Sequence, residues 1–278
     1  MSFKTTLGDQ FQNLKKEAPV QNMKYLVYDI ESIVDKNLVN RILYAHEGLT
    51  DEAAYQRHLE EQIKNTGKSF PNAIFHMPVA LAVVALGADY SIQKIGLLGH
   101  EEKTSLSITQ HFWDIYNNNQ ATLVDFNGSG YDMRLMELWA FREGISISPQ
   151  HFQKFGARYR FSEDRHLDLQ DSLNNNGAIR YMGGLDLLAK LLGKPGKLET
   201  KGEMVQQMHD EGKLFEIEDY CLGDTLDTYF VFLRWMVVQG KLTKAKEGVL
   251  EAQAFVKMAE HAEKTGYLKK YLKACGKL

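Results

Sequence analysis

The order of two periodicities along the chain constrains its fold more than any other feature of the sequence. Apolar, strand-forming runs occupy the first part, and helical patterns occupy the part that begins at Gly184. The expected strands cover residues 24–28, the run that follows Pro78, 91–98, 121–126 and 166–170. The expected late helices cover residues 185–192, 201–211, 216–238 and 249–274. This order predicts an α/β protein in which helices cover a mixed sheet, although the run after Pro78 would also suit a buried helix.

A single domain is expected to hold the sheet, because the sequence has no internal repeat, low-complexity tract or long linker. We place it at residues 24–240, after a polar N-terminal lead (1–23) and before a C-terminal helical extension (241–278). Within the domain, residues 36–70 form a helical insertion between the first two strands, with a polar helix at 49–66. The insertion is either a lid or partner surface or an inert surface element.

Composition excludes several classes of protein. With 44% hydrophobic residues, the chain of 278 residues can bury a substantial core, and no apolar run reaches the ~18 residues of a membrane span. We expect a cytoplasmic protein, because the N-terminus lacks the apolar centre of a signal peptide and only Cys221 and Cys275 are present. A net charge of −3 argues against binding nucleic acid through bulk positive charge. Basic residues are nevertheless dense at 194–201 and 264–277, where they either touch phosphates or form solvated helix ends.

Asp29 and Glu31 follow the first strand-forming run, and their spacing sends both side chains to one face of a strand. Two carboxylates there are costly unless a positive group lies between them. Mg²⁺ is commonly held by one or two carboxylates, with water and phosphate completing its shell. The pair therefore suits a metal site, and the alternative is a strand that ends before two solvated acids.

Tyr220, Asp224 and Asp227 recur at helical spacing, so they fall on one stripe of a helix. The residues that follow are strongly apolar, which predicts that this helix docks against the body of the protein. The stripe is either an ordinary exposed face or part of a site.

Asp132 follows a turn that starts at Asn127 and contains two glycines, and it falls in the first turn of the next helix. The turn lacks the spacing and the lysine of a P-loop, and it does not make a dinucleotide-binding fingerprint. A carboxylate at this place either complements the helix N-terminus or joins the other acids. The glycines would also let a nucleic-acid backbone approach the turn.

Taken together, these motifs resemble the three exonuclease motifs of the proofreading domain of family-B DNA polymerases. Their order is Asp-x-Glu on the first strand, Asn-x₃-Tyr-Asp after a later strand and Tyr-x₃-Asp on a late helix. More narrowly, the chain is similar to predicted stand-alone bacterial 3′→5′ exonucleases related to that domain, from about Lys24 to Trp235 and including residues 166–171 and 183–193. The resemblance implies the tyrosine-type (DEDDy) branch of the four-acid exonucleases. It also implies a ribonuclease H-like fold with a central mixed five-stranded sheet, flanking helices and extra C-terminal helices.

The resemblance further implies roles for individual residues. Four acids match the metal-binding acids and would be catalytic: Asp29, Glu31, Asp132 and Asp224. Tyr220 matches the catalytic tyrosine that orients the attacking water. Asn127 matches a motif residue near the terminal nucleotide, and Tyr131 is expected to bind nucleic acid with it. Three acids close to the motifs are not selected by them and are expected to be structural: Asp125, Asp168 and Asp227.

The implied activity is 3′→5′ hydrolysis of single-stranded DNA by a two-metal-ion mechanism with Mg²⁺ or Mn²⁺, releasing nucleoside monophosphates. About 40 residues follow Trp235, too few for polymerase modules, so the enzyme would act on 3′ ends alone or beside a separate polymerase or repair partner, and not at a membrane. Two alternatives stay open: an exoribonuclease with the same site, and a catalytically silent nucleic-acid-binding module. A third is an unrelated α/β protein whose acids match by coincidence.

Overall fold

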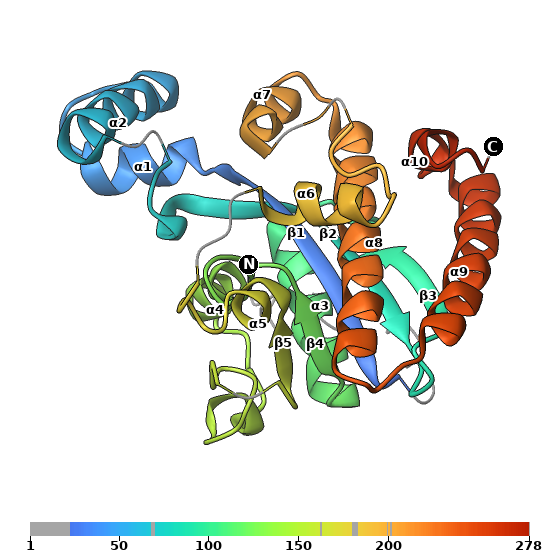
Figure 1. The fold of residues 1–278 in the computed structure, drawn as a ribbon. Helices are drawn as coiled ribbons and strands as arrows, with labels where there is room; N and C mark the ends of the chain where they lie inside the picture. Colours follow the sequence, from blue (N-terminus) through green and yellow to red (C-terminus); the bar gives the residue numbers. More distant parts are fainter. Residues whose placement is uncertain are drawn as a thin grey trace, which may run out of the picture.

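The computed structural model describes residues 23–67, 70–161, 163–179, 183–198, 200 and 202–277. Its centre is a five-stranded sheet in the order β3-β2-β1-β4-β5 (Figure 1). β1 (Tyr25–Val34) pairs antiparallel with β2 (His76–Leu86), which pairs antiparallel with β3 (Ile92–Leu97). On its other side β1 is parallel to β4 (Thr122–Asp125), which is parallel to β5 (His166–Asp168). The predicted mixed five-stranded sheet is therefore confirmed.

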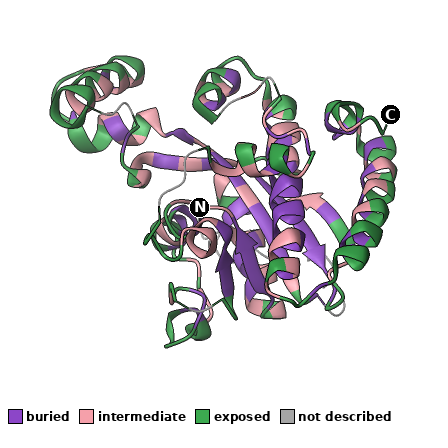
Figure 2. Cartoon of the chain, in the orientation of Figure 1, coloured by how far each residue is buried: buried purple, intermediate pink, exposed green. Residues whose placement is uncertain are grey.

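Helices cover both faces of the sheet, because the side chains of β1 alternate between two apolar cores. Val27 and Ile33 belong to the core that α8 (Leu214–Val238) helps to form. Tyr28 belongs to the core on the opposite face, built with α3 (Ser105–Asn119) and α4 (Asp132–Glu143). α9 (Lys244–Thr265) packs beside α8 and reaches β3. Figure 2 shows the buried sheet enclosed by helices whose outer faces are exposed.

Apart from α2, the other helices are shorter, and most lie around the edge of the sheet. α1 (Lys36–Leu43) and α2 (Asp51–Thr66) fill the predicted insertion, project from the body and share a small core around Val39 and Tyr44 (Figure 1). The remaining elements are η2 (Ala73–Phe75), η3 (Pro149–Phe152), α5 (Leu169–Leu173), α6 (Gly184–Leu191), η4 (Gly202–Met204), α7 (Val205–Asp210) and α10 (Lys269–Ala274). No helix in the described part of the chain is long and apolar enough to cross a membrane.

Several element boundaries differ from those that the sequence predicts. β1 continues to Val34 instead of ending before its acids, and α1 follows it directly. The expected strand 166–170 ends at Asp168, because the Asp168 carboxylate accepts hydrogen bonds from the next backbone N–H groups and caps α5. The expected helix 249–274 starts earlier and is broken at Gly266, whose left-handed backbone (φ 85°) ends α9. The expected N-terminal lead, apart from Met23, lies outside the described residues.

Candidate active site

The two acids of the first strand lie within β1, on the face that α8 covers. Asp29 and Glu31 lie between Val27 and Ile33 at every second position of β1, so they share a face with them. Val27 and Ile33 belong to the core beneath α8. Glu31 is buried and Asp29 is partly exposed. The alternative of a strand that ends before two solvated acids is therefore wrong, because the strand continues past both of them.

α8 brings the second part of the site to the same place. Asp224 is buried rather than exposed, because the long apolar face of α8 presses this stripe against the sheet. The carboxylate oxygens of three acids lie within 4.8 Å of one another, and we call this group the acidic cluster: Asp29, Glu31 and Asp224. Asp227, one turn further along α8, is buried outside the cluster and accepts a hydrogen bond from the Tyr271 hydroxyl (2.5 Å).

Asp132, the fourth predicted metal-binding acid, lies beside the acidic cluster and is not within that 4.8 Å group. It is buried as the first residue of α4. Burial and the charge of Asp125 raise the pKa of Asp132 to about 8. The charge of Asp132 in turn raises the pKa values of Asp29 and Glu31, so the four acids share one electrostatic environment.

The acidic cluster is electrostatically unbalanced. Burial and the neighbouring carboxylates raise the pKa values of Asp29 and Glu31 well above their ordinary range. Burial raises the pKa of Asp224 to about 6, although Lys197 and a hydrogen bond from Tyr220 oppose the rise. Crowded carboxylate oxygens with so little compensating charge are the donor set that Mg²⁺ or Mn²⁺ prefers, so the residues fit divalent cations.

Tyr220 is placed to donate a hydrogen bond rather than to remove a proton. Its hydroxyl is hydrogen-bonded to Asp224. Burial and the charges of Asp224, Glu31 and Asp29 raise the pKa of Tyr220 above its ordinary value, so the phenol stays protonated at neutral pH. A neutral phenol beside the acidic cluster can orient a water molecule or a phosphate oxygen.

Cys221 also contacts the acidic cluster, yet its chemistry does not suggest a metal ligand. The buried thiol donates to the backbone carbonyl oxygen of Asp29 (3.3 Å). Burial and then the charge of Asp29 raise the pKa of the Cys221 thiol well above its ordinary value. Because a thiolate is the form that binds metal, the protonated thiol leaves the oxygen ligands to define the site.

Lys197 is a site residue that the sequence motifs do not select. It lies in the irregular segment after α6, where its backbone N–H donates to the Asp186 carboxylate (2.7 Å). Its positive charge lowers the pKa values of all three acids of the cluster, and its ammonium lies 5.6 Å from the centre of the Tyr220 ring. The only signal in the sequence is the basic stretch 194–201, which the solvated-helix-end alternative does not explain at this position.

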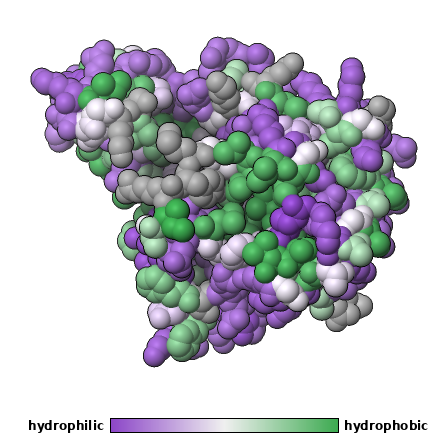
Figure 3. Space-filling view, viewed as in Figure 1, coloured by the Kyte–Doolittle hydropathy of each residue, from purple (hydrophilic) through white to green (hydrophobic). Residues whose placement is uncertain are grey.

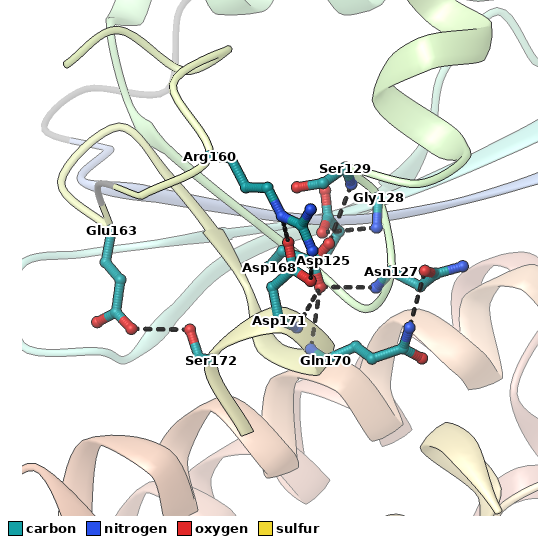
Figure 4. Close-up of polar contacts among 10 residues, drawn as sticks. All are labelled: Asp125, Asn127, Gly128, Ser129, Arg160, Glu163, Asp168, Gln170, Asp171 and Ser172. Atoms are coloured by element: carbon teal, nitrogen blue, oxygen red, sulfur yellow. Dashed lines mark hydrogen bonds and ion pairs between the residues drawn. The ribbon is translucent and has the colours of Figure 1, made fainter. Parts of the chain in front are cut away.

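The turn that precedes Asp132 is held by a second group of buried residues, which we call the turn network: Asp125, His166 and Asp168. Figure 4 shows the hydrogen bonds that Asp125 and Asp168 accept from the turn. Asp168 accepts hydrogen bonds from the N–H groups of Asn127 (2.9 Å) and Ser129 (3.0 Å), and Asp125 accepts one from Gly128 (3.0 Å). A Cβ atom on Gly128 would lie 1.9 Å from an Asp125 oxygen, so this glycine admits the Asp125 carboxylate rather than a nucleic-acid backbone.

His166 supplies the positive charge of the turn network. Its Nε2 lies 2.6 Å from an Asp125 oxygen, and both side chains are buried. Burial alone would lower the pKa of His166, but the charge of Asp125 and their hydrogen bond raise it to about 9. Asp125 and Asp168, two of the three acids that the motifs leave out, are thus satisfied by a cation and by backbone donors.

Asn127 and Tyr131, the two predicted nucleic-acid-binding residues, lie at opposite ends of this turn. Asn127 has a left-handed backbone (φ 72°), and its side-chain oxygen accepts a hydrogen bond from Gln170 (2.9 Å). The Tyr131 hydroxyl is bonded to Ser32 (2.5 Å) and to His76 Nδ1 (3.0 Å). Contact of either residue with nucleic acid stays a prediction.

Comparison with known families identifies the family of the chain. A family model described as a predicted 3′-5′ exonuclease related to the exonuclease domain of PolB matches residues 68–275. The match includes Asp132, Tyr220 and Asp224, and it begins after Asp29 and Glu31, which β1 brings to Asp224. Comparison with curated proteins gave no match. The sheet and its flanking helices agree with the ribonuclease H-like fold expected from the sequence, and the chain belongs to this family of predicted 3′-5′ exonucleases related to the exonuclease domain of PolB.

Proposed function

We propose that the protein is a 3′→5′ exonuclease that hydrolyses single-stranded DNA with divalent cations and releases nucleoside monophosphates. The observation that carries the proposal is the acidic cluster. Carboxylates from β1 and α8, elements far apart in the sequence, crowd within 4.8 Å and bear raised pKa values. A fold gains nothing from such crowding unless a cation offsets it, and nuclease chemistry uses cations in this way.

The cations proposed are two Mg²⁺ or Mn²⁺ ions. Asp29, Glu31 and Asp224 would hold them, with Asp132 as the fourth ligand at the edge of the cluster. Such ions, when bound, supply a nucleophilic hydroxide at neutral pH and stabilise charge on the leaving oxygen. The protein's part is to keep the carboxylates ionised and facing one another, which the charge of Lys197 favours.

Two further side chains would act on the substrate directly. Tyr220 would donate its hydrogen bond to the attacking water, since its phenol stays protonated. Lys197, with its ammonium over the Tyr220 ring, would pair with a phosphate oxygen of the nucleotide being removed. Neither contact reads base identity, so low sequence specificity is expected.

Single-stranded DNA is the proposed substrate, and RNA is the alternative because the same cluster can hydrolyse either polymer. Discrimination would depend on a contact to the ribose 2′ hydroxyl. A separate polymerase or repair protein that supplies the 3′ end is part of the proposal.

A gel assay with 5′-labelled single strands tests the function. Wild-type protein should shorten DNA from its 3′ end in Mg²⁺ or Mn²⁺ and should stop when a chelator is added. Asp29→Asn should be inactive, whereas Glu216→Gln, which removes an exposed acid from the first turn of the same α8, should be as active as the wild type. A parallel RNA ladder gives the ratio of the two rates. Folded wild-type protein that cuts neither polymer with metal present would instead support the silent binding module.

A further inference from the structure

The segment 152–161 carries an unusual set of exposed rings. It connects η3 to the strand β5 and forms the yellow-green extension at the lower left of Figure 1. Its aromatic residues are Phe152, Phe155, Tyr159 and Phe161. Three of them are largely exposed: Phe152 (53%), Phe155 (55%) and Phe161 (68%). Figure 3 shows hydrophobic groups interspersed with hydrophilic ones over this part of the surface. Gathered exposed rings mark an interaction surface more often than scattered ones do.

Basic side chains alternate with these rings. Lys154, Arg158 and Arg160 fall within the segment, and residues 144–162 contain no acid, although the whole chain has a net charge of −3. The Lys154 ammonium lies 5.1 Å from the centre of the Phe155 ring, and the Arg158 guanidinium lies 5.7 Å from that of Phe152. Such alternation of cations and aromatic faces is how proteins bind single-stranded nucleic acid without reading its sequence.

Neighbouring acids neutralise part of this charge. Arg158 lies 3.4 Å from a Glu137 oxygen, and Arg160 binds Asp171 through Nε (2.8 Å) and Nη2 (2.9 Å). About half of each arginine side chain remains exposed. Among the described residues, Lys154 has the Phe155 ring and no carboxylate as a partner, so it is the residue best placed to meet a phosphate.

Segment 152–161, which we call the platform, is fixed to the body of the protein by buried residues and by its own backbone hydrogen bonds. Ala157 and His151 are buried and anchor it to the body. Its backbone turns on itself through hydrogen bonds from Gly156 to Gln153 (2.8 Å) and from Arg158 to His151 (3.1 Å). Phe155 adopts a left-handed backbone (φ 65°), which is costly for a bulky residue and persists only where the surroundings impose it. The Phe155 ring is 55% exposed and also contacts the Tyr159 ring, with the ring centres 5.1 Å apart.

A short chain of contacts joins this platform to the turn that carries Asn127, as Figure 4 shows. Arg160 binds Asp171, and the Asp171 N–H donates to Asp168 (3.2 Å). Asp168 in turn holds the backbone N–H of Asn127 (2.9 Å). Segment 152–161 is thus tied through Arg160 to the turn that carries Asn127.

We propose that segment 152–161 binds the single strand upstream of the 3′ end that is cut, with Phe155 and Phe161 stacking on bases and Lys154 contacting a phosphate. The proposal rests on the function proposed above. It assigns a strand-binding surface outside the acidic cluster, and it requires unpaired bases, because stacked bases in a duplex offer no free faces.

The test measures binding, so that it is separate from cleavage. Asp29→Asn protein, checked by gel to be uncleaving, is titrated into fluorescein-labelled 20-mer and 5-mer oligo-dT and oligo-U while anisotropy is recorded. Adding Phe155→Ala and Phe161→Ala should raise the Kd for the 20-mers about tenfold and should leave the 5-mers within about twofold. The matched control adds Phe141→Ala, which removes an 89% exposed ring from α4 and should leave all Kd values unchanged.

Two further variants test the proposal independently. Phe161→Ala alone truncates a side chain that is 68% exposed, so it reports the effect even if the double variant is unstable. Lys154→Ala should reduce the slope of log Kd against log salt concentration by about 1. No binding of the 20-mers, unchanged Kd values in both phenylalanine variants, or an equal loss with Phe141→Ala would each overturn the proposal. Preference for an equally long duplex or for an acidic peptide would overturn it as well.

The outcomes also separate this proposal from the proposed function. Wild-type protein that never cuts, together with 20-mer binding lost in the phenylalanine variants, would refute the exonuclease and keep the strand-binding surface. Metal-dependent cutting with binding unaffected by the variants would keep the exonuclease and refute the surface.

Discussion

Two groups of acids lie on the neighbouring strands β1 and β4, completed by α8 and β5 respectively, and they differ in how their oxygens are satisfied. The acidic cluster combines crowded carboxylates with the charge of Lys197, the one cation among the described residues that lowers their pKa values. The turn network contains its own cation, His166, and its carboxylates accept several backbone N–H groups. Five of the six side chains are buried and Asp29 alone is partly exposed, so burial does not distinguish the two groups. The two groups differ in how much of their negative charge is compensated. The acidic cluster is the less compensated group, so it is the place where a cation from solution is needed.

The largest expected effect comes from removing one charge of the acidic cluster. Asp29→Asn keeps the shape of the side chain, and it should lower the exonuclease rate by about a thousandfold or more, because one cation ligand is lost. It should not destabilise the protein in chelator, since the Asn removes charge repulsion rather than a stabilising contact. Rates and denaturant unfolding in chelator measure both expectations. A variant that keeps its activity or that unfolds easily would place Asp29 in the same structural class as the turn network.

The turn network should respond in the opposite way. His166→Gln leaves Asp125 buried without its cation, so the free energy of unfolding should fall by about 3–5 kcal/mol. The double variant with Asp125→Asn should recover part of that loss. His46→Gln, at an exposed position, serves as the control. Denaturant titration is the measurement, and unchanged stability in His166→Gln would remove the distinction between the two groups.

The features of the site that depend on periodicity could be predicted from the sequence. Alternation in β1 places Asp29 and Glu31 on one face, and the spacing of Tyr220 and Asp224 places both on one side of α8. The order of strands and helices gave the mixed sheet correctly. The alternative that the Tyr220 and Asp224 stripe is an ordinary exposed face was wrong. Whether a helical stripe is covered depends on what packs against it, and the sheet covers Asp224.

Other features depend on contacts that periodicity does not encode. Lys197 reaches the acidic cluster from an irregular segment, whose path depends on the hydrogen bond to Asp186. The pairing of Asp125 with His166 depends on the register of β4 against β5, in which Leu123 lies opposite His166. Asp132 lies outside the 4.8 Å group because its turn is held by the turn network, which no motif reveals.

Tyr220→Phe tests the role of the hydroxyl beside the acidic cluster, because it removes a hydroxyl and no charge. If the hydroxyl orients the water, kcat should fall by about 10- to 100-fold while the metal concentration needed for half activity stays the same. Tyr55→Phe on α2 is the control. A changed metal requirement with normal kcat would show that the hydroxyl acts only by supporting Asp224.

Lys197→Met tests the cation that lowers the pKa values of the acidic cluster. Without its charge the pKa values of the three acids should rise further, so the acidic limb of the rate–pH profile should move to higher pH. The rate at neutral pH should fall about tenfold, because a charged contact to phosphate is lost as well. Lys213→Met, at an exposed position, should change neither quantity. An unshifted limb would mean that Lys197 lies too far from the acids to act on them.

The smallest expected effect is a difference between the two groups in how stability depends on pH. Asp224, with a pKa raised to about 6, and Asp132, raised to about 8, bind protons in the folded state that they would release when unfolded near pH 4. Stability in chelator should therefore fall as pH rises from 4 to 8, by at most about 1.4 kcal/mol per pH unit for each group.

His166 contributes in a different window. Its folded pKa of about 9 exceeds its ordinary value of about 6.5, so its contribution is complete below pH 6.5 and is lost as pH rises through 9. Between pH 5 and 6.5 the contribution of His166 is constant, whereas His76, whose pKa burial lowers to about 4, adds a slope of opposite sign that does not depend on Mg²⁺. The change in the slope of denaturant-measured stability when excess Mg²⁺ is added therefore reports the acids, whose own slope it should flatten. His166→Gln should leave that slope intact and remove the His166 part of the loss between pH 7 and 9, while the part due to Asp132, whose pKa is about 8, should remain. If Mg²⁺ affected both windows equally, the cation would not be acting through the acidic cluster.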